Sequence, residues 1–336
     1  MPMHALDPSG FHPAFVLAVL GLLAGGLLAW RRSLRRGLQI FSVVLFFSLL
    51  WLAAFGGRLD WPVDLYLAAD PLLALVSNLA GRVLVPFTLI SLAFVALAAV
   101  MGRVFCSHIC PMGALLDLGD LVWGRRQKAE ANRESFRALR PAKYFILLSL
   151  LAGALAGFHW LGWVDPIVLF TRFSALIFYP FAVMLQDLGL DLMRPVADGL
   201  EWTSLSYLEL QAPIFAGTLL SVLFMLFLML LGRLQTRFWC RHICPLGGML
   251  AWVGHAAPYR RRVSDACTAC NLCVRRCPTG AIHKGGLATD AHECIVCLQC
   301  VQVCPEQAVR CSFSSKQASS DLSGPGLSRR GFFGGI

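Results

Sequence analysis

The chain has 336 residues, of which 57% are hydrophobic and only 14% are charged, and its formal net charge is +10. Because soluble domains usually carry about 25% charged residues, this composition excludes an ordinary soluble protein and indicates an integral membrane protein with a smaller polar part. A positive net charge indicates nucleic-acid binding only where it forms a basic stripe or domain, so the positions of the basic residues decide that question.

Five uncharged stretches are long enough to cross a bilayer, since a spanning helix needs about 20 mostly apolar residues. They are Phe11–Trp30, Gly37–Gly57, Val83–Gly102, Tyr144–Val164 and Ala212–Gly232. A sixth stretch, Phe173–Gln186, is uncharged for only 14 residues, and we expect it to be interfacial or re-entrant rather than spanning. The sequence therefore predicts an integral membrane helical bundle, mainly α, of five spans.

The basic residues are distributed unevenly between the loops. Of the 29 Lys and Arg residues, 25 lie in the segments 31–36, 103–143 and 233–336. The loops 58–82 and 165–211 hold only four, which are Arg58, Arg82, Arg172 and Arg194. By the positive-inside rule, the sequence predicts a multi-pass protein of a bacterial cytoplasmic (inner) membrane, with the N-terminus outside. This asymmetry accounts for most of the positive charge, so we expect no nucleic-acid partner. All 13 cysteines lie on the cytoplasmic side, where metal ligation or thiol chemistry is expected rather than disulfides.

The strongest motif lies between residues 267 and 305. It contains two runs of the form C-x2-C-x2-C-x3-C-P, offset by 27 residues. In this bacterial 4Fe–4S pattern the fourth cysteine of each run ligates the other cluster. One cluster is therefore expected on Cys267, Cys270, Cys273 and Cys304, and the other on Cys294, Cys297, Cys300 and Cys277. Zinc also binds C-x2-C pairs, but eight cysteines in two such runs disfavour it. Cys311 is left over as a structural or incidental thiol.

A second repeat lies where the third and fifth spans reach the cytoplasmic side. Residues 103–116 and 237–250 are identical at eight of 14 positions, and each copy contains a C-x3-C-P motif. Proline disfavours helical geometry in the residue before it, so each span is expected to end near the second cysteine and a new helix to begin at the proline. The repeat predicts a duplicated helical hairpin, with the first span as an addition.

The duplication places the four C-x3-C-P cysteines at one membrane depth. If the hairpins pack about a pseudo-two-fold axis, these thiols converge, and soft thiolates select Fe–S clusters, zinc or Cu(I). We therefore expect a third metal centre, with 4Fe–4S favoured, on Cys106, Cys110, Cys240 and Cys244. The alternative is two pairs of free thiols with a packing or dithiol role. His108 and His242 are candidates for hydrogen-bond donors behind the ligands or for proton carriers, or are interfacial residues copied by the duplication.

A quinone site is not visible in the sequence. Asp70, Asp165 and His159 are candidates because they are polar and near the expected outer face, although aspartate before proline is also a common helix-entry or turn device. The Ser- and Gly-rich end of the chain is expected to be a flexible tail. Its Ser328-Arg329-Arg330 segment is similar to the start of a twin-arginine export signal.

Two C-x3-C-P motifs at membrane exits, followed by a two-cluster ferredoxin, resemble the NapH/NosR-type membrane ferredoxins over about residues 38–311. The resemblance implies electron transfer between the quinol pool, menaquinol or ubiquinol, and other redox subunits of a membrane complex, such as ferredoxin-like or cytochrome subunits. This chain departs from the typical form by its first span and its long loop 165–211, and it lacks the outer flavin-carrying domain of the NosR branch. It also resembles the CcoG-type accessory proteins.

The sequence thus predicts five regions. They are an N-terminal span with a basic loop (1–36), a first hairpin (37–140), a second hairpin (141–258), an α+β two-cluster ferredoxin-like domain (259–311) and the tail (312–336). The favoured function is a membrane iron–sulfur electron-transfer subunit, of the quinol dehydrogenase type, in an anaerobic respiratory complex. The alternatives are an accessory factor that donates electrons to reduce a metal during metalloenzyme assembly, and a structural anchor of a redox complex.

Overall fold

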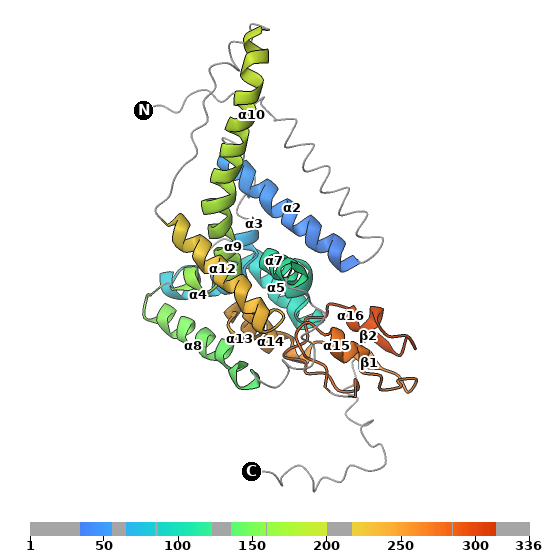
Figure 1. The fold of residues 1–336 in the computed structure, drawn as a ribbon. Helices are drawn as coiled ribbons and strands as arrows, with labels where there is room; N and C mark the ends of the chain where they lie inside the picture. Colours follow the sequence, from blue (N-terminus) through green and yellow to red (C-terminus); the bar gives the residue numbers. More distant parts are fainter. Residues whose placement is uncertain are drawn as a thin grey trace.

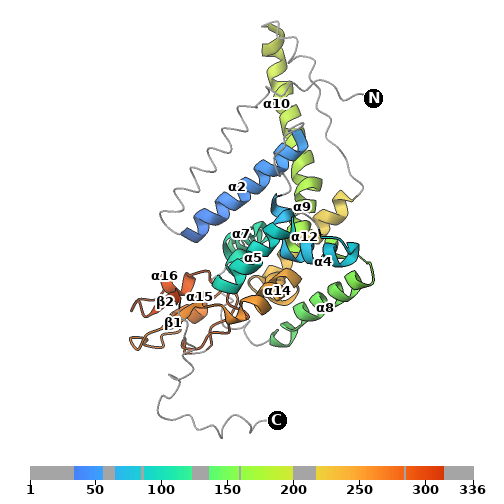
Figure 2. The same cartoon turned by 180° about the vertical axis from the view of Figure 1, so that it is seen from behind.

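The computed structural model describes residues 34–55, 65–84, 87–122, 136–158, 160–199, 217–283 and 285–313. Helices form most of this part, and a small segment with a two-stranded sheet lies at one end (Figures 1 and 2). The expected first span, Phe11–Trp30, and the segment Ser328-Arg329-Arg330 lie outside the described residues. The N-terminal topology and the nature of the tail therefore stay predictions.

Two successive sets of helices correspond to the two expected hairpins. The first set is α2 (Leu34–Phe55), α3 (Leu65–Ala68), α4 (Pro71–Gly81), α5 (Thr88–Met101), α6 (Val104–His108) and α7 (Pro111–Val122). The second set is α8 (Ala142–Leu155), α9 (Pro166–Phe173), α10 (Tyr179–Gly199), α12 (Thr218–Leu234), α13 (Phe238–His242) and α14 (Pro245–Val253). Single turns lie beside the second set: η1 (Arg137–Leu139), η2 (Leu161–Trp163), η3 (Ser174–Phe178) and η4 (Gly254–Ala256).

Proline begins a helix at four corresponding places. Helices α7 and α14 begin at Pro111 and Pro245, as the C-x3-C-P motifs predict, and α4 and α9 begin at Pro71 and Pro166. Proline is favoured at the first helical position because it lacks an N–H that would have no partner there. The long helices α5 and α12 end earlier than expected, at Met101 and Leu234, and the short helices α6 and α13 carry the first cysteine of each motif.

The two sets pack against each other with matching contacts, which indicates a pseudo-two-fold arrangement. Helix α7 contacts α9 and α12, and its counterpart α14 contacts α4 and α5. Helix α2 contacts α6 and α7, and its counterpart α8 contacts α13 and α14. The helix that follows each C-x3-C-P motif, α7 or α14, therefore packs on helices of the other hairpin, and the cysteines of both motifs lie inside this shared core.

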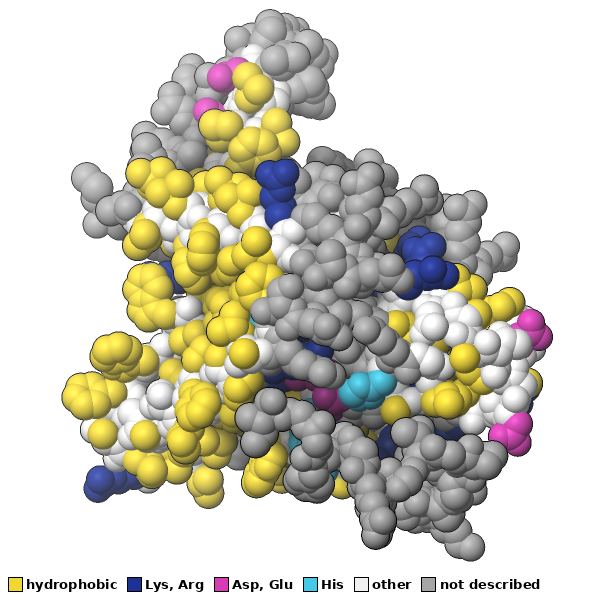
Figure 3. Space-filling model, turned by 60° about the horizontal axis from the view of Figure 1, so that its bottom comes forward, with side chains coloured by type: hydrophobic (Ala, Val, Ile, Leu, Met, Phe, Trp, Pro, Cys, Tyr) yellow, Lys and Arg dark blue, Asp and Glu magenta, His cyan; other side chains and the backbone are white. Residues whose placement is uncertain are grey.

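Several helices expose large apolar side chains. Phe145 and Leu148 on α8, and Leu219 and Phe227 on α12, are each more than half exposed. Hydrophobic side chains gather over this side of the molecule (Figure 3). Apolar surface of this extent is unusual on a soluble monomer and is typical of a membrane or protein interface.

One stretch is both long and apolar enough to cross a membrane, within the part of the chain that the structure describes. It is Pro166–Asp191, with 26 residues, and it contains the segment Phe173–Gln186 that was expected to be interfacial. The expected spans at Val83–Gly102, Tyr144–Val164 and Ala212–Gly232 correspond to shorter apolar helices of 14, 14 and 17 residues. The five-span arrangement is therefore not confirmed by helix length.

The C-terminal segment contains one antiparallel strand pair and two short helices. Strand β1 (Tyr259–Val263) pairs with β2 (Val309–Phe313), in a register that places Tyr259 opposite Phe313. Helices α15 (Leu272–Arg276) and α16 (Gln299–Gln302) lie between the two strands in the chain order, and they pack against each other. This is the α+β segment that the cysteine runs predict. Strand β2 extends two residues beyond the boundary expected at Cys311.

Candidate iron–sulfur sites

Two cavities in the ferredoxin segment are each lined by four of the expected ligands. The first is lined by Cys267, Cys270, Cys273 and Cys304. The second is lined by Cys277, Cys294, Cys297 and Cys300, together with Cys311. Each cavity therefore takes three cysteines from one run and the fourth cysteine from the other run, which is the crossed arrangement that the spacing predicts.

Left-handed backbone positions shape both cavities in the same way. Ala269 and Asn271 have φ of 52° and 59°, and the residues 27 positions later, Val296 and Leu298, have φ of 50° and 59°. Non-glycine residues adopt this conformation at a cost of roughly 1–3 kcal/mol each. The repeated strain turns the chain between neighbouring cysteines and directs them to one cavity, so these loops fit a bound cluster.

Arg261 lies between the two cavities. Its guanidinium lines the second cavity, and its Nη2 is 3.6 Å from the Cys273 Sγ of the first. It also donates to the Gly286 carbonyl oxygen at 2.6 Å and to the Thr289 hydroxyl at 2.9 Å. A fixed positive charge in this position stabilises negative charge on both sets of thiolates.

The four C-x3-C-P cysteines form a third group, inside the helical core. Cys106, Cys110, Cys240 and Cys244 are all buried, and they belong to one hydrophobic cluster. They are close enough for the charge of the Cys106 and Cys240 thiolates to act on both Cys110 and Cys244. The Cys244 Sγ accepts a hydrogen bond from the Gly247 N–H, 3.2 Å away.

Burial determines the ionisation of these thiols. It raises the pKa of Cys110 and Cys244 well above the ordinary value, and nearby thiolates raise it further. Burial likewise raises the pKa of Cys240 to about 11, although Arg237 opposes the shift. Thiols in such a place bind a metal only by releasing their protons, because the thiolate is the ligand.

One arginine from each C-x3-C-P repeat donates a hydrogen bond to the other repeat. Arg237 Nη1 donates to the Cys106 carbonyl oxygen at 3.2 Å, and Arg103 Nη2 donates to the Cys240 carbonyl oxygen at 3.4 Å. Both arginines are about 1% exposed. These reciprocal hydrogen bonds tie the two cysteine loops together and place two positive charges beside four thiols.

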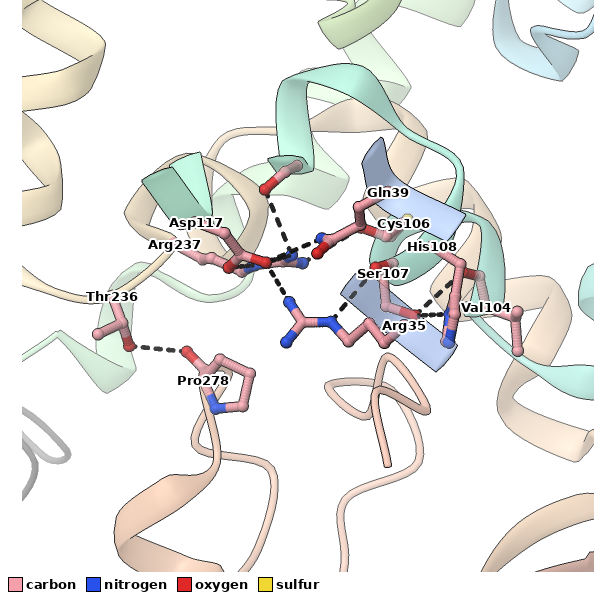
Figure 4. A network of polar contacts seen from close by, with 11 residues as sticks. Arg35, Gln39, Val104, Cys106, Ser107, His108, Asp117, Thr236, Arg237 and Pro278 are labelled. Carbon is pink, nitrogen blue, oxygen red and sulfur yellow. Dashed lines mark hydrogen bonds and ion pairs between the residues drawn. The ribbon is translucent and has the colours of Figure 1, made fainter. Parts of the chain in front are cut away.

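A carboxylate holds one of these arginines in position. Asp117 on α7 accepts hydrogen bonds from Arg237, at 2.9 Å from Nε and 2.8 Å from Nη2, and it also pairs with Arg35 of α2 (Figure 4). Gln39 donates to the same carboxylate at 2.9 Å. Burial alone would raise the pKa of Asp117, but the charges and hydrogen bonds of Arg237 and Arg35 outweigh it and lower the pKa well below its ordinary range.

The ferredoxin segment packs against the part of the helical core that holds the four C-x3-C-P cysteines. Ile295 is buried in the same hydrophobic cluster as the four cysteines, and Cys297 packs against that cluster. Lys143 Nζ pairs with Glu293 at 2.6 Å, and Arg103 Nη1 donates to the His292 carbonyl oxygen at 2.9 Å. The second cavity is therefore the one adjacent to the helical core.

Within the described residues, no group of three or more His, Cys, Asp or Glu side chains is arranged around a single metal ion. A cubane cluster does not require such a group, because each of its thiolates binds a different iron atom. Four cysteine thiols are the usual donor set of a 4Fe–4S cluster, and all three cysteine groups supply that set.

Comparisons with known proteins match the same segments. A family model described as a 4Fe-4S binding domain matches residues 84–129 and 217–264, and a 4Fe-4S dicluster domain model matches residues 259–311. The ferredoxin-type protein NapH of Escherichia coli is 26% identical over 74% of this chain and 77% of its own length. The chain is thus similar to ferredoxin-type proteins named NapH and MauN, and it contains matches to two 4Fe–4S domain models.

Other relatives of this chain carry different names. The methylamine utilization ferredoxin-type protein MauN of Methylobacillus flagellatus is 29% identical over 62% of this chain and 60% of its own length. The putative electron transport protein YccM of E. coli is 26% identical over 57% of this chain and 45% of its own. The chain thus spans less than two thirds of these two relatives. No solved structure matches it.

The two repeated histidines, His108 and His242, contact groups other than the cysteines. His108 Nδ1 contacts the Ser107 hydroxyl and the Val104 carbonyl oxygen. His242 Nε2 is 2.7 Å from Gln235 Oε1. Burial and the charge of Arg241 lower the pKa of His242 to about 4, so this ring is neutral at physiological pH.

Of the three quinone-site candidates, the structure describes Asp70 and Asp165 but not His159. Asp70 and Asp165 are fully buried N-caps of α4 and α9, where each accepts two backbone hydrogen bonds. Helices α4 and α9 pack against α14 and α7, so both carboxyl groups lie inside the helical core. His159 lies outside the described residues. A quinone site therefore remains a prediction.

Several residues of the site were not singled out from the sequence. Arg103 and Arg237 lie three positions before the first cysteine of each motif, so the repeat itself contained the signal. Asp117, Lys143 and Glu293 gave no such signal, since Asp117 binds Arg237 from 120 positions away and Lys143 binds Glu293 from 150 positions away.

Proposed function

We propose that this protein is a membrane iron–sulfur electron-transfer subunit, which exchanges electrons between the quinol pool and a redox partner protein. One observation carries the proposal: the second ferredoxin cavity and the four C-x3-C-P cysteines share one packed core, through Ile295 and Cys297. A ferredoxin segment fixed in this way to an apolar helical domain is suited to move electrons to or from a membrane carrier.

The proposed relay has three centres. Cys267, Cys270, Cys273 and Cys304 would hold the first, Cys294, Cys297, Cys300 and Cys277 the second, and Cys106, Cys110, Cys240 and Cys244 the third. Bound 4Fe–4S clusters would supply one-electron chemistry. Cys270 is exposed, whereas the four cysteines of the third group are buried. The first centre would therefore face the partner protein, and the third would face the membrane.

The chain's own residues provide the environment for this transfer. Arg103 and Arg237 are fully buried beside the third group and compensate its thiolate charge. Arg261 does the same between the ferredoxin cavities. Lys143, Arg103 and Glu293 hold the ferredoxin segment in a fixed position, which keeps the order of the centres constant.

The proposed location is a bacterial inner membrane, with the ferredoxin segment on the cytoplasmic side. The uneven distribution of basic residues and the exposed apolar faces of α8 and α12 support it. In intact, metal-depleted cells, a membrane-impermeant thiol reagent should leave the chain unmodified. Modification of Cys267–Cys304 under these conditions would contradict the proposed orientation.

The functional test is reduction by quinol under anaerobic conditions, with the native partner present. Addition of a menaquinol or ubiquinol analogue should change the cluster spectra of the unmodified chain. In Cys106→Ala and Cys240→Ala, quinol should no longer reduce the ferredoxin clusters, whereas dithionite should still do so. If neither quinol nor quinone changes the spectra of the assembled complex, an accessory or anchoring function replaces electron transfer with quinol.

A further inference from the structure

Two buried aspartates from the two hairpins meet in the core. Asp70 caps α4, and its Oδ1 accepts hydrogen bonds from the N–H groups of Leu72 at 2.9 Å and Leu73 at 3.3 Å. Asp165 caps α9 in the same way, with N–H donors at 2.9 and 3.1 Å. Both aspartates have 0% exposure, α3 packs against both of the helices that they cap, and the two carboxyl groups interact with each other.

The second oxygen of each carboxyl group has no donor. Asp70 Oδ2 and Asp165 Oδ2 are buried, and neither receives a hydrogen bond from any described group. No Lys or Arg of the described residues forms an ion pair with either side chain. Two adjacent buried carboxylates repel each other, and both are costly to keep ionised away from water. A hydrogen bond between the two carboxyl groups requires a proton on one of them.

The surroundings favour a proton over a metal cation. The neighbours Leu72, Leu161 and Ile167 are fully buried and apolar, and one oxygen of each carboxyl group is already used by backbone N–H groups. Hard cations require about six or more oxygen ligands, whereas a shared proton requires only the two remaining oxygens. These surroundings fit a shared proton better than a metal cation.

This pair is electrostatically linked to the four-cysteine group. The charge of Asp165 acts on the thiols of Cys110 and Cys244. The contacts are crossed, because α9 packs on α7 and α4 packs on α14. Within the described residues, no hydrogen bond joins either aspartate to a cysteine, so the link acts through charge.

Other titratable groups on the surrounding helices interact with partners other than Asp70 and Asp165. Tyr66 of α3 is hydrogen-bonded to Ser42 of α2. Three charged groups on or next to α5, α7 and α8 form the contacts already described: Arg103 with His292 and Glu293, Asp117 with Arg35 and Arg237, and Lys143 with Glu293. Asp120 of α7 is buried and faces Gly232 of α12, and Arg172 of α9 lies over the Trp163 ring. Each aspartate thus interacts with the other aspartate of the pair, and the charge of Asp165 acts in turn on the thiols of Cys110 and Cys244.

We propose that the Asp70–Asp165 pair holds one shared proton, and that it takes up a second when the centre on the C-x3-C-P cysteines gains one electron. The electron comes from the ferredoxin segment or the membrane carrier, and the proton comes from water. The pair changes from one negative charge to none, so the total charge of the buried region stays constant. The redox coupling rests on the proposed function; the shared proton does not.

The shared proton is tested by infrared spectroscopy of the full chain. The unmodified protein should show a protonated-carboxyl band that shifts in D2O. Asp70→Asn and Asp165→Asn should each remove it, while the amide oxygen still caps the helix. Asp265→Asn, at an exposed position, should leave it unchanged. Absence of the band in the unmodified protein, or its persistence in both buried variants, overturns the shared proton.

The coupling is tested by redox titration of the third centre, followed by electron paramagnetic resonance at several pH values. One proton per electron gives a potential that falls by about 59 mV per pH unit. The slope should be close to zero in Asp165→Asn and unchanged in Asp265→Asn. A pH-independent potential in the unmodified protein overturns the coupling. If Cys106→Ala removes no iron, the third centre and the coupling both fail, and the infrared band still decides whether the pair holds a proton.

Discussion

Arg237 donates a hydrogen bond to the carbonyl oxygen of Cys106, 3.2 Å away and 131 positions earlier in the chain. The duplicated hairpins make this contact twice, since Arg103 reaches Cys240 in the same way. Each arginine therefore stabilises the cysteine loop of the other hairpin, and neither loop is complete in its own hairpin.

Arg237→Met should destabilise the protein and lower the iron content of the third group. The substitution leaves Asp117 buried with one positive partner fewer, and breaking a buried ion pair in this way costs about 3–5 kcal/mol. Arg275→Ala, which changes an exposed arginine, should have little effect. Thermal unfolding and iron analysis of both variants measure the difference. Equal behaviour of the two variants would show that the crossing contact is unimportant.

Gly113→Ala should be more harmful than Gly247→Ala. A Cβ at 113 would lie 2.8 Å from the Cys106 carbonyl oxygen, so backbone would have to move. A Cβ at 247 would lie 2.7 Å from Arg103 Nη2, the end of a flexible side chain. Overpacking of the first kind costs about 1–3 kcal/mol. Gly162→Ala, where nothing lies within 4 Å, is the control, and the order of the melting temperatures tests the prediction.

Cys277→Ala should damage the second ferredoxin centre, although Cys277 belongs to the first cysteine run. Its side chain lines the cavity of Cys294, Cys297 and Cys300. Electron paramagnetic resonance spectra of the unmodified protein and of the Cys277→Ala variant identify which ferredoxin cluster changes. Loss of only the cluster held by Cys267, Cys270 and Cys273 would refute the crossed ligation.

Glu293→Gln should loosen the ferredoxin segment from the helical core. The substitution leaves the ammonium of Lys143 and the guanidinium of Arg103 without their carboxylate in a buried place, at a cost of about 3–5 kcal/mol. Asp290→Asn breaks the more exposed pair with Arg140 and should cost about 1 kcal/mol or less. Proteolysis between the helical core and the ferredoxin segment should be faster in Glu293→Gln alone. Similar rates in both variants would contradict a role of Glu293 in attachment.

The sequence predicts the local features of this protein well. The starts of α7 and α14 follow from Pro111 and Pro245, and the two ferredoxin cavities follow from the cysteine spacing. Both depend on residues close together in the chain, where the physical chemistry of proline and of short cysteine loops is decisive.

The long-range features could not be predicted in the same way. Lys143 and Glu293 are 150 positions apart, and no local pattern pairs them. Asp70 and Asp165 each precede a proline at the start of a helix, which the sequence shows, but their burial in the core follows from no local pattern. The meeting of these carboxyl groups depends on the packing of the two hairpins.

The central claim is that the duplicated helical core holds a third centre next to the ferredoxin clusters. Iron and sulfide analysis of anaerobically purified full chain tests it most directly. Three cubanes require about 12 iron atoms per chain, and Cys106→Ala or Cys240→Ala should reduce this to about eight. Cys311→Ala, which changes a cysteine outside the three ligand sets, should leave the iron content unchanged. A fully loaded chain with about eight iron atoms, unaffected by Cys106→Ala and Cys240→Ala, would contradict the third centre.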